Sequence, residues 1–342
     1  MAFKCQRWTL ANALPVIFVL WIIATIYGAH AWLHLRPLRE RDPCSFYVEA
    51  AVSNTLTALL LVCLGRAMFT DPGSVPDVPE WRDAQGGVWG SWQGTRGGPV
   101  SRDQTGESGS VVHEVKQTGG RRFCKWCDSY KPDRCHHCRV CKSCVLRMDH
   151  HCPWIANCVG FRNHKCFFLL VLYSFLNCAF IFVTMSQSLV RSLSLEYRSS
   201  MERFLMVFGL TLACIMALLL KAFLSLHIWL MLKATTTIEL CEKRSRQGCS
   251  KPLPCYEQGA YENLRAVLGP SPLLWLLPVA PPAGDGLHFP VREARACAAQ
   301  GADAGASVGA PAGAAGGGGA LLGPEAETDA PAAQGGESPV AR

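Results

Sequence analysis

Two long stretches without a single Asp, Glu, Lys or Arg are the strongest constraint on how this chain can fold. One runs from Trp8 to Leu35 and the other from Cys166 to Val190. Each exceeds the ~20 residues that a helix needs to cross the hydrocarbon core of a bilayer. Residues 44–69 and 204–232 are nearly as apolar, and they carry only three charged residues: Glu49, Arg66 and Lys221. The pattern predicts four membrane-spanning helices.

The alternative for the second and fourth stretches is a pair of buried core helices in a soluble domain. Against it, neither stretch shows polar residues at the helical spacing that a globular surface requires. The whole chain is also lean in charge, at 17% charged against 49% hydrophobic residues. We therefore expect an all-α multi-pass membrane protein.

The distribution of Lys and Arg predicts the orientation. Residues 121–166 hold ten of them against three Asp, whereas the loops 36–43 and 191–203 are close to neutral. The positive-inside rule therefore places residues 121–166 and both termini in the cytosol. Glu49 is near the lumenal end of the second span, and we expect it to be interfacial and without function.

Composition divides the chain into six segments. The linker after the second span is rich in Gly, Ser, Gln and Pro and should be flexible, and the Ala, Gly and Pro of the tail predict disorder. The expected segments are the first two spans (1–73), a cytosolic insert (74–120), a cysteine-rich domain (121–166), the third and fourth spans (167–233), a cytosolic segment (234–280) and a tail (281–342).

The cysteine-rich domain has the composition of a metal-binding module. It contains nine of the eighteen cysteines and five of the ten histidines. Cysteines separated by two residues let two thiolates reach one ion from a tight turn, and sulfur combined with imidazole favours zinc. Two tetrahedral sites would use eight ligands, whose division between the ions the spacing leaves open: Cys124, Cys127, His137, Cys138, Cys141, Cys144, His151 and Cys158.

A basic zinc module can also bind nucleic acid. Here the module lies between membrane spans, and no expected helix carries a separate basic recognition face, so we expect no nucleic-acid partner. The same positive charge suits anionic lipid headgroups or the phosphates of a nucleotide-bearing cofactor.

Cys152 is a cysteine that the metal count does not require, as are Cys135 and Cys166. His150 could take the proton of its thiol, and Asp149 could fix the imidazole tautomer. Adjacent residues of an extended chain point in opposite directions, so we expect a local bend, with which Pro153 is consistent. The alternative is that all three residues are structural and that Cys152 is a spare ligand.

Four motifs resemble those of the DHHC-type protein S-acyltransferases. The cysteine and histidine spacing ends in Asp149-His150-His151-Cys152-Pro153-Trp154, and Asp71-Pro72-Gly73 follows the second span. Thr236-Thr237-Ile238-Glu239 resembles the family's Thr-Thr-x-Glu motif. The segment from Tyr256 to Gly269, with Asn263, resembles its C-terminal packing motif.

The resemblance implies roles for the residues. Cys152 would accept a fatty acyl group from acyl-CoA and pass it to cysteine thiols of substrate proteins at the cytosolic face, with His150 as general base oriented by Asp149. It also implies two closed, structural zinc sites. One would be formed by Cys124, Cys127, His137 and Cys144, and the other by Cys138, Cys141, His151 and Cys158.

The resemblance further implies contacts with the acyl donor, whose fatty chain would lie in a cavity among the spans. Lys131, Arg134 and His136 would contact CoA phosphates, although each could be an ordinary solvated charge. Trp154 would pack beside the thioester or serve packing alone. Asn177 lies about where the family tunes chain length, and a helix–helix hydrogen bond is the alternative.

Two other functions compete with the enzyme. A non-catalytic scaffold would not need Asp149, His150 and Cys152 together. A zinc transporter would need His, Asp or Glu within the spans, where the sequence offers almost none. We expect an integral protein of the Golgi or endoplasmic reticulum membrane, with the plasma membrane as the alternative. The sequence does not indicate the substrate proteins.

Overall fold

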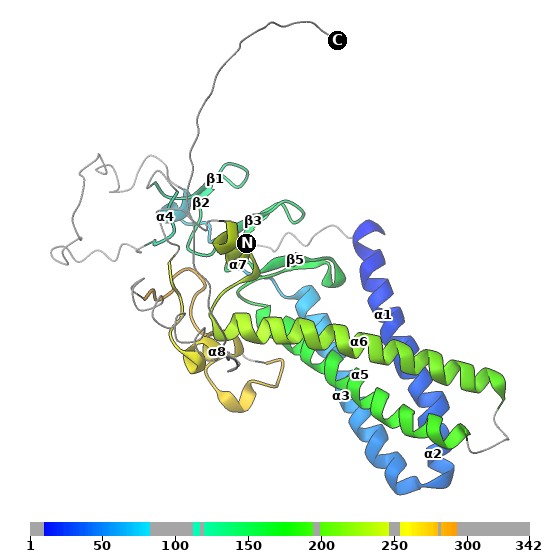
Figure 1. Ribbon diagram of the computed structural model, residues 1–342. Helices are drawn as coiled ribbons and strands as arrows, with labels where there is room; N and C mark the ends of the chain where they lie inside the picture. The colour runs from blue at the N-terminus through cyan, green and yellow to red at the C-terminus, as the bar shows by residue number, and fades with distance from the viewer. Residues whose placement is uncertain are drawn as a thin grey trace, which may run out of the picture. The chain divides into compact units, whose positions relative to one another are not determined.

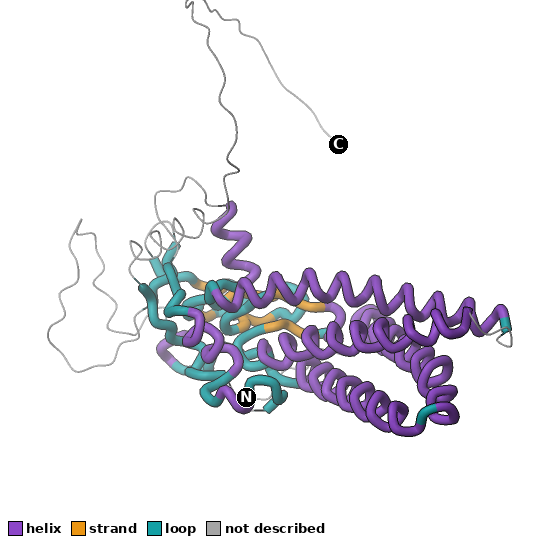
Figure 2. The backbone as a smooth tube through the Cα atoms, turned by 60° about the horizontal axis from the view of Figure 1, so that its bottom comes forward, coloured by secondary structure: helices purple, strands orange, loops and turns teal. Residues whose placement is uncertain are grey.

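The computed structural model describes residues 10–82, 112–116, 120–193, 199–245, 254–279 and 282–292, and these are mostly helical (Figures 1 and 2). Four helices are long and apolar enough to cross a membrane: Asn12–Arg41, Pro43–Phe69, His164–Ser192 and Ser200–Leu232. They match the four predicted spans. Most of the predicted insert and tail lies outside the described residues.

The first two spans form a helical hairpin. Helix α1 (Leu10–His30) continues through a π-helical turn, η1 (Ala31–Leu35), into α2 (Arg36–Arg41). The chain then reverses into α3 (Pro43–Phe69). Asp42 caps α3, because its carboxylate accepts a hydrogen bond from the Ser45 N–H at 3.2 Å, and Pro43 occupies the first helical position.

Helices α5 (His164–Leu193) and α6 (Ser200–Leu232) complete the bundle. Half of the most apolar window of α5 is buried, compared with 17–22% for the other three spans. Helix α5 packs against both α3 and α6, so it is the inner helix of the four. The apolar residues that the other spans leave exposed match the lipid-facing surface of a membrane protein.

The cysteine-rich domain between the second and third spans consists of three antiparallel hairpins. They pair β1 (Phe123–Cys124) with β2 (Ser129–Tyr130), β3 (His136–Cys138) with β4 (Ser143–Val145), and β5 (His150–Cys152) with β6 (Asn157–Val159). The tight turns of the hairpins contain Asp128, Lys142 and Ala156, all at positive φ. The short 3₁₀ turn η2 (Pro153–Ile155) joins β5 to β6.

The Asp71-Pro72-Gly73 motif attaches this domain to the end of α3. The Asp71 carboxylate accepts a hydrogen bond from the Gly73 N–H at 2.8 Å, and Gly73 has a φ of 107° that favours glycine. The Gly73 carbonyl accepts from the Leu146 N–H at 2.9 Å. A Cβ on Gly160 would lie 2.7 Å from the Pro72 carbonyl oxygen, so only glycine permits this approach.

An asparagine completes the attachment. The Asn157 amide donates to the carbonyls of Ala67, Met68 and Thr70 at 3.0–3.1 Å. These carbonyls belong to the last turn of α3, where helix carbonyls lack partners within the helix. The β5–β6 hairpin is therefore held against the end of a membrane span.

The segments after α6 pack back onto the domain and the bundle. They contain α7 (Thr237–Ser245), α8 (Ala260–Leu268) and the 3₁₀ turn η3 (Pro272–Leu274), whereas the one-turn helix α4 (Pro79–Arg82) lies between α3 and the cysteine-rich domain. Asn263 of α8 donates to the Leu232 carbonyl at 2.7 Å and accepts from the Gln258 N–H at 3.0 Å. Residues 282–292, which the sequence analysis assigns to the tail, place Phe289 against Phe161 and Tyr256.

Candidate metal centres and active site

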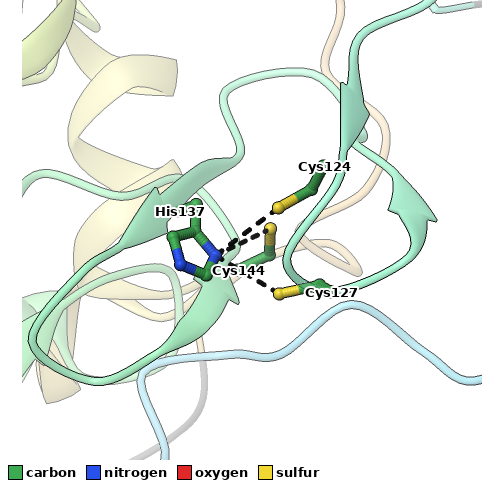
Figure 3. Close-up of side chains that lie close together, drawn as sticks. All are labelled: Cys124, Cys127, His137 and Cys144. Carbon is green, nitrogen blue, oxygen red and sulfur yellow. Dashed lines mark hydrogen bonds between the residues drawn. The ribbon is translucent and has the colours of Figure 1, made fainter.

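Cys124, Cys127, His137 and Cys144 form the first group of metal-ligating side chains (Figure 3). The β1–β2 hairpin supplies two cysteines, and the paired residues His137 and Cys144 come from β3 and β4. His137 Nδ1 lies 3.3–3.9 Å from the three sulfurs. Ligand atoms of one tetrahedral zinc ion lie roughly 3.3–3.8 Å apart, so the group fits such an ion.

Cys138, Cys141, His151 and Cys158 form the second group. His151 Nδ1 lies 3.4–3.7 Å from the three sulfurs, and the sulfurs of Cys141 and Cys158 are 3.4 Å apart. The β3–β4 hairpin contributes to both groups, since neighbouring residues of a strand face opposite sides. The structure thus brings together the two ligand sets that the sequence resemblance implied.

Cys152 belongs to neither group. It is the last residue of β5, and its side chain is 5% exposed. It belongs to an apolar cluster that includes Ile155 of η2, Leu60 of α3 and Phe167 of α5. The thiol therefore lies where the cysteine-rich domain meets the apolar helix bundle.

The strand geometry of β5 explains how three consecutive residues divide their roles. His151 points toward the second metal group. Residues two apart share a face of a strand, so His150 and Cys152 lie together on the other face, where Cys152 contributes to the raised pKa of His150. The expected local bend is not needed between the imidazole and the thiol, because alternation along the strand already brings them together.

Asp149 is buried next to His150, with 1% of its surface exposed. Its carboxylate lies 2.7 Å from His150 Nδ1 and accepts a hydrogen bond from the Thr237 N–H at 3.0 Å. The Thr237 hydroxyl donates to the Asp149 backbone carbonyl and lies 3.2 Å from the carboxylate. Burial alone would raise the pKa of Asp149. The hydrogen bond with His150, the positive charges of His164 and His150 and the Thr237 N–H outweigh burial and hold that pKa well below its ordinary value.

His150 has a pKa raised from 6.5 to about 9. Burial opposes protonation, but hydrogen bonds and charges of Asp149 and Cys152 outweigh it. A protonated imidazole beside a thiol favours the thiolate, which is the nucleophilic form of cysteine. The arrangement is suited to nucleophilic catalysis by sulfur, with an imidazole that holds and returns a proton.

The sequence analysis gave no role to Thr237, His164 or His227. Thr237 lies in the Thr-Thr-x-Glu motif, which was the available signal for it. The rings of His227 and His150 have centroids 6.1 Å apart, and those of His227 and His164 are 6.5 Å apart. No spacing in the sequence connects these two histidines with the motif.

Arg134 is buried in an ion pair with Glu239 of the same motif. Its guanidinium donates to both carboxylate oxygens, at 2.6 and 2.9 Å, and to the Ala234 carbonyl at 2.7 Å. Burial would raise the pKa of Glu239, but the charge and hydrogen bonds of Arg134 lower it. Arg134 thus fastens α7 to the cysteine-rich domain, a role that the sequence analysis did not foresee.

The other residues expected to contact the acyl donor differ in their exposure to solvent. Lys131 and His136 are partly buried, and burial together with the charges of Arg122 and Lys131 lowers the pKa of His136 to about 4. Trp154 follows Cys152 by two residues. It is 51% exposed, and its ring lies 6.2 Å from that of Phe18 in α1.

A cavity of about 380 Å³ lies between the cysteine-rich domain and the C-terminal segment. Arg134 and Arg147 line it together with Arg265 and His288. Arg147 is buried, and its Nε has no hydrogen-bond partner among the described residues. The cavity therefore presents positive charge that the described protein groups do not fully satisfy.

Comparison with known proteins identifies the family. The model of the DHHC palmitoyltransferase family matches residues 117–244. The chain is 36% identical over 297 residues to the probable protein S-acyltransferase 16 of Arabidopsis thaliana, which covers 81% of this chain and 92% of that protein. The chain belongs to the DHHC palmitoyltransferase family. It is a membrane-bound protein S-acyltransferase.

Two mammalian palmitoyltransferases match a shorter part of the chain. Human ZDHHC15 is 39% identical over 182 residues, which is 53% of each protein. Mouse ZDHHC2 is 40% identical over 180 residues, which is 52% of this chain and 49% of that protein. The chain therefore spans about half the length of these relatives, whereas its similarity to the Arabidopsis protein is nearly end to end.

Proposed function

We propose that Cys152 is the residue that carries the acyl group in the S-acyltransfer reaction. The supporting observation is its position: a buried thiol outside both metal groups, on the same strand face as His150 and in the apolar cluster that includes residues of α3 and α5. A thiol bound to metal would be tied to its ion, and a thiol on the polar surface would not meet an acyl chain. Cys152 avoids both restrictions.

The reaction has two thiol exchanges. The Cys152 thiolate attacks the carbonyl carbon of the acyl-CoA thioester, the bond to the CoA sulfur breaks, and the leaving sulfur takes the proton held by His150. A substrate cysteine then gives its proton to His150 and attacks the Cys152 thioester, which releases Cys152 as a thiolate. Asp149, held by Thr237, orients His150 and stabilises its protonated form.

Acyl-CoA is the donor in this proposal. Burial of a fatty chain is worth about 0.8 kcal/mol per methylene, so the chain belongs among the spans and the CoA head in water. The thioester must then lie at the boundary, which is the level of Cys152. Trp154 would pack beside it. Lys131 and the arginine-lined cavity that includes Arg134 are the positive groups available for CoA phosphates, and His136, whose pKa is lowered to about 4, would contact them as a neutral hydrogen-bond donor.

The two metal groups would each hold a structural zinc ion. Three thiolates and one imidazole fill four coordination positions, so the donor sets leave none open for a reacting water. The bound ions would cross-link the three hairpins, which have little apolar core of their own, and so hold β5 and its three functional residues in place.

The cysteine-rich domain would face the cytosol, with both termini on the same side. The Lys and Arg content of residues 121–166 supports this orientation. Substrate proteins would then present accessible cysteines at the cytosolic surface of the lipid bilayer. A Golgi or endoplasmic reticulum membrane fits such a protein, and a plasma membrane is the alternative.

The test is acylation of the purified full chain in detergent with labelled palmitoyl-CoA. We expect a hydroxylamine-labile label that is lost in Cys152→Ala. The matched control is Cys241→Ala, which removes an exposed cysteine of α7 and should keep the label. Equal labelling of Cys152→Ala and the wild type would overturn the proposal.

A further inference from the structure

A third group of ligand-type side chains lies away from the cysteine-rich domain. Ligand atoms of His30, His34 and Glu49 all lie within 4.8 Å of one another. They sit at the end of the bundle where α2 joins α3, opposite the end that carries the hairpins (Figure 1). The sequence predicts that Glu49 is interfacial and that the spans hold almost no such groups. Instead, Glu49 contacts a buried histidine of the first span.

The two histidines are arranged for joint binding. They are four residues apart on one helix, a spacing that places both imidazoles on the same face and recurs in zinc-binding helices. Their rings are stacked, with centroids 5.0 Å apart. His34 lies in the π-helical turn η1, a rare distortion that occurs frequently at functional sites.

The hydrogen bonds of His30 indicate which ring nitrogen carries the lone pair that a metal ion could use. The Thr184 hydroxyl donates its hydrogen to the Phe180 carbonyl at 3.0 Å. Its oxygen is then an acceptor for the His30 Nε2–H at 3.1 Å. In a neutral imidazole the other nitrogen, Nδ1, carries a lone pair. Among the described residues, Nδ1 contacts only the Ser53 hydroxyl, at a long 3.4 Å.

His34 has a similar arrangement. Its Nδ1 lies 2.7 Å from the Ser188 hydroxyl of α5, and its Nε2 is in contact with the Glu49 carboxylate. A ligating histidine commonly donates its second N–H to an oxygen, which fixes the ring, and Ser188 is placed for that role. Binding of a cation at Nε2 would release the proton from that nitrogen to water and draw the carboxylate onto the ion.

We propose that His30, His34 and Glu49 bind a divalent transition-metal ion. Two imidazoles and one carboxylate are a donor set for zinc that leaves a fourth position for water. Among the described residues, the ion pair of Glu49 is with His34. A charged carboxylate is costly inside a membrane protein, and a bound divalent ion would neutralise its charge. The ion would tie α1 to α3, with Thr184 and Ser188 of α5 as outer contacts.

The test is zinc stoichiometry in the purified full chain. Wild type, Glu49→Gln and Glu40→Gln are loaded with zinc in detergent, desalted and measured by elemental mass spectrometry against protein sulfur. We expect about three zinc ions per wild-type chain and about two for Glu49→Gln. Glu40→Gln, an exposed change on α2, should match the wild type.

Cobalt substitution provides the control for folding. The two cysteine groups give intense thiolate-to-cobalt absorption, whereas a site without sulfur does not. If Glu49→Gln binds one metal ion fewer than the wild type but has the same thiolate absorption, the third site is supported. Two zinc ions or fewer in the wild type, or equal counts in the wild type and Glu49→Gln, would overturn it and leave a hydrogen-bonded contact between helices.

Discussion

The two ends of the helix bundle carry ligand-type side chains in different ways. At the cysteine-rich end, all eight ligands lie between Cys124 and Cys158, and short hairpins bring them together. At the opposite end, His30 and His34 meet Glu49 across two helices, and their hydroxyl partners come from α5, 154 residues along the chain. A group of side chains that are close in the sequence can be predicted from their spacing. A group assembled from distant segments can be found only once the fold is known.

The same difference separates the sources of stability. The hairpins have two or three residues per strand, and their order would depend on bound metal. The far end consists of helices whose packing does not require an ion. Loss of metal should therefore unfold one end and leave the other largely intact.

Cys138→Ala tests this difference with the largest expected effect. It removes a ligand that β3 supplies to the second group, so we expect bound zinc and acylation to fall together, with acylation lost almost completely. Metal content and labelling by palmitoyl-CoA are measured on the same sample. Cys152→Ala is the matched control, and it should lose acylation while both cysteine groups keep their metal. Full acylation of Cys138→Ala would contradict the structural role of the metal groups.

Arg134→Met tests whether the cysteine-rich end also depends on a buried ion pair. The change leaves the Glu239 carboxylate buried without its partner, which costs about 3–5 kcal/mol. We expect a clearly lower melting temperature in detergent. The double variant Arg134→Met/Glu239→Leu should regain much of the loss, since it leaves no unpaired charge. A single variant as stable as the wild type would show that the pair is not needed to hold α7.

The contacts of Thr237 and Arg134 could not be predicted from the sequence, whereas the spans and the two groups of Cys and His could. Uncharged length predicted the four spans, and the spacing of Cys and His predicted the eight residues that the structure gathers into two groups, because both patterns are local. Motif resemblance pointed to Asp149, His150 and Cys152. It did not reveal the partner of Asp149, since Thr237 is 88 residues away in the chain, nor the pairing of Arg134 with Glu239, 105 residues away. Such pairs are created by the packing of α7 on the domain.

Thr237→Val tests the contact with Asp149. It removes the hydroxyl that donates to the Asp149 backbone carbonyl and lies beside the carboxylate, and it keeps the backbone N–H. A hydrogen bond between uncharged groups is worth about 0.5–1.5 kcal/mol, so we expect the acylation rate to fall by roughly two- to tenfold, with metal retained. Thr237→Ser keeps the hydroxyl and should retain most of the rate. Equal rates for the valine and serine variants would exclude this role of the hydroxyl.

The pH dependence of stability tests the raised pKa of His150. Protonation stabilises the folded state, because the pKa rises from 6.5 to about 9 on folding. The contribution is complete below pH 6.5 and is lost as the pH rises through about 9. The difference in melting temperature between the wild type and His150→Gln should shrink over that range. A constant difference would contradict the raised pKa.

Asn177→Leu, between the two ends, should have the smallest effect. The Asn177 amide donates to the Thr57 hydroxyl at 3.2 Å, which matches the helix–helix hydrogen bond considered as an alternative role. Such bonds within membranes average about 0.6 kcal/mol, and the buried Asn177 Oδ1 has no partner among the described residues. We expect a change in melting temperature of no more than a few degrees. A large loss would assign this residue a greater part in holding α3 to α5.

The most direct test of the central claim is to locate the acyl group in the intact enzyme. The full chain is incubated briefly with palmitoyl-CoA, zinc content is measured, and the acylated peptide is identified by mass spectrometry. The account predicts one hydroxylamine-labile acyl group on Cys152 while both cysteine groups retain their metal. An acyl group found on one of the eight ligand cysteines or histidines, or loss of metal on acylation, would contradict it.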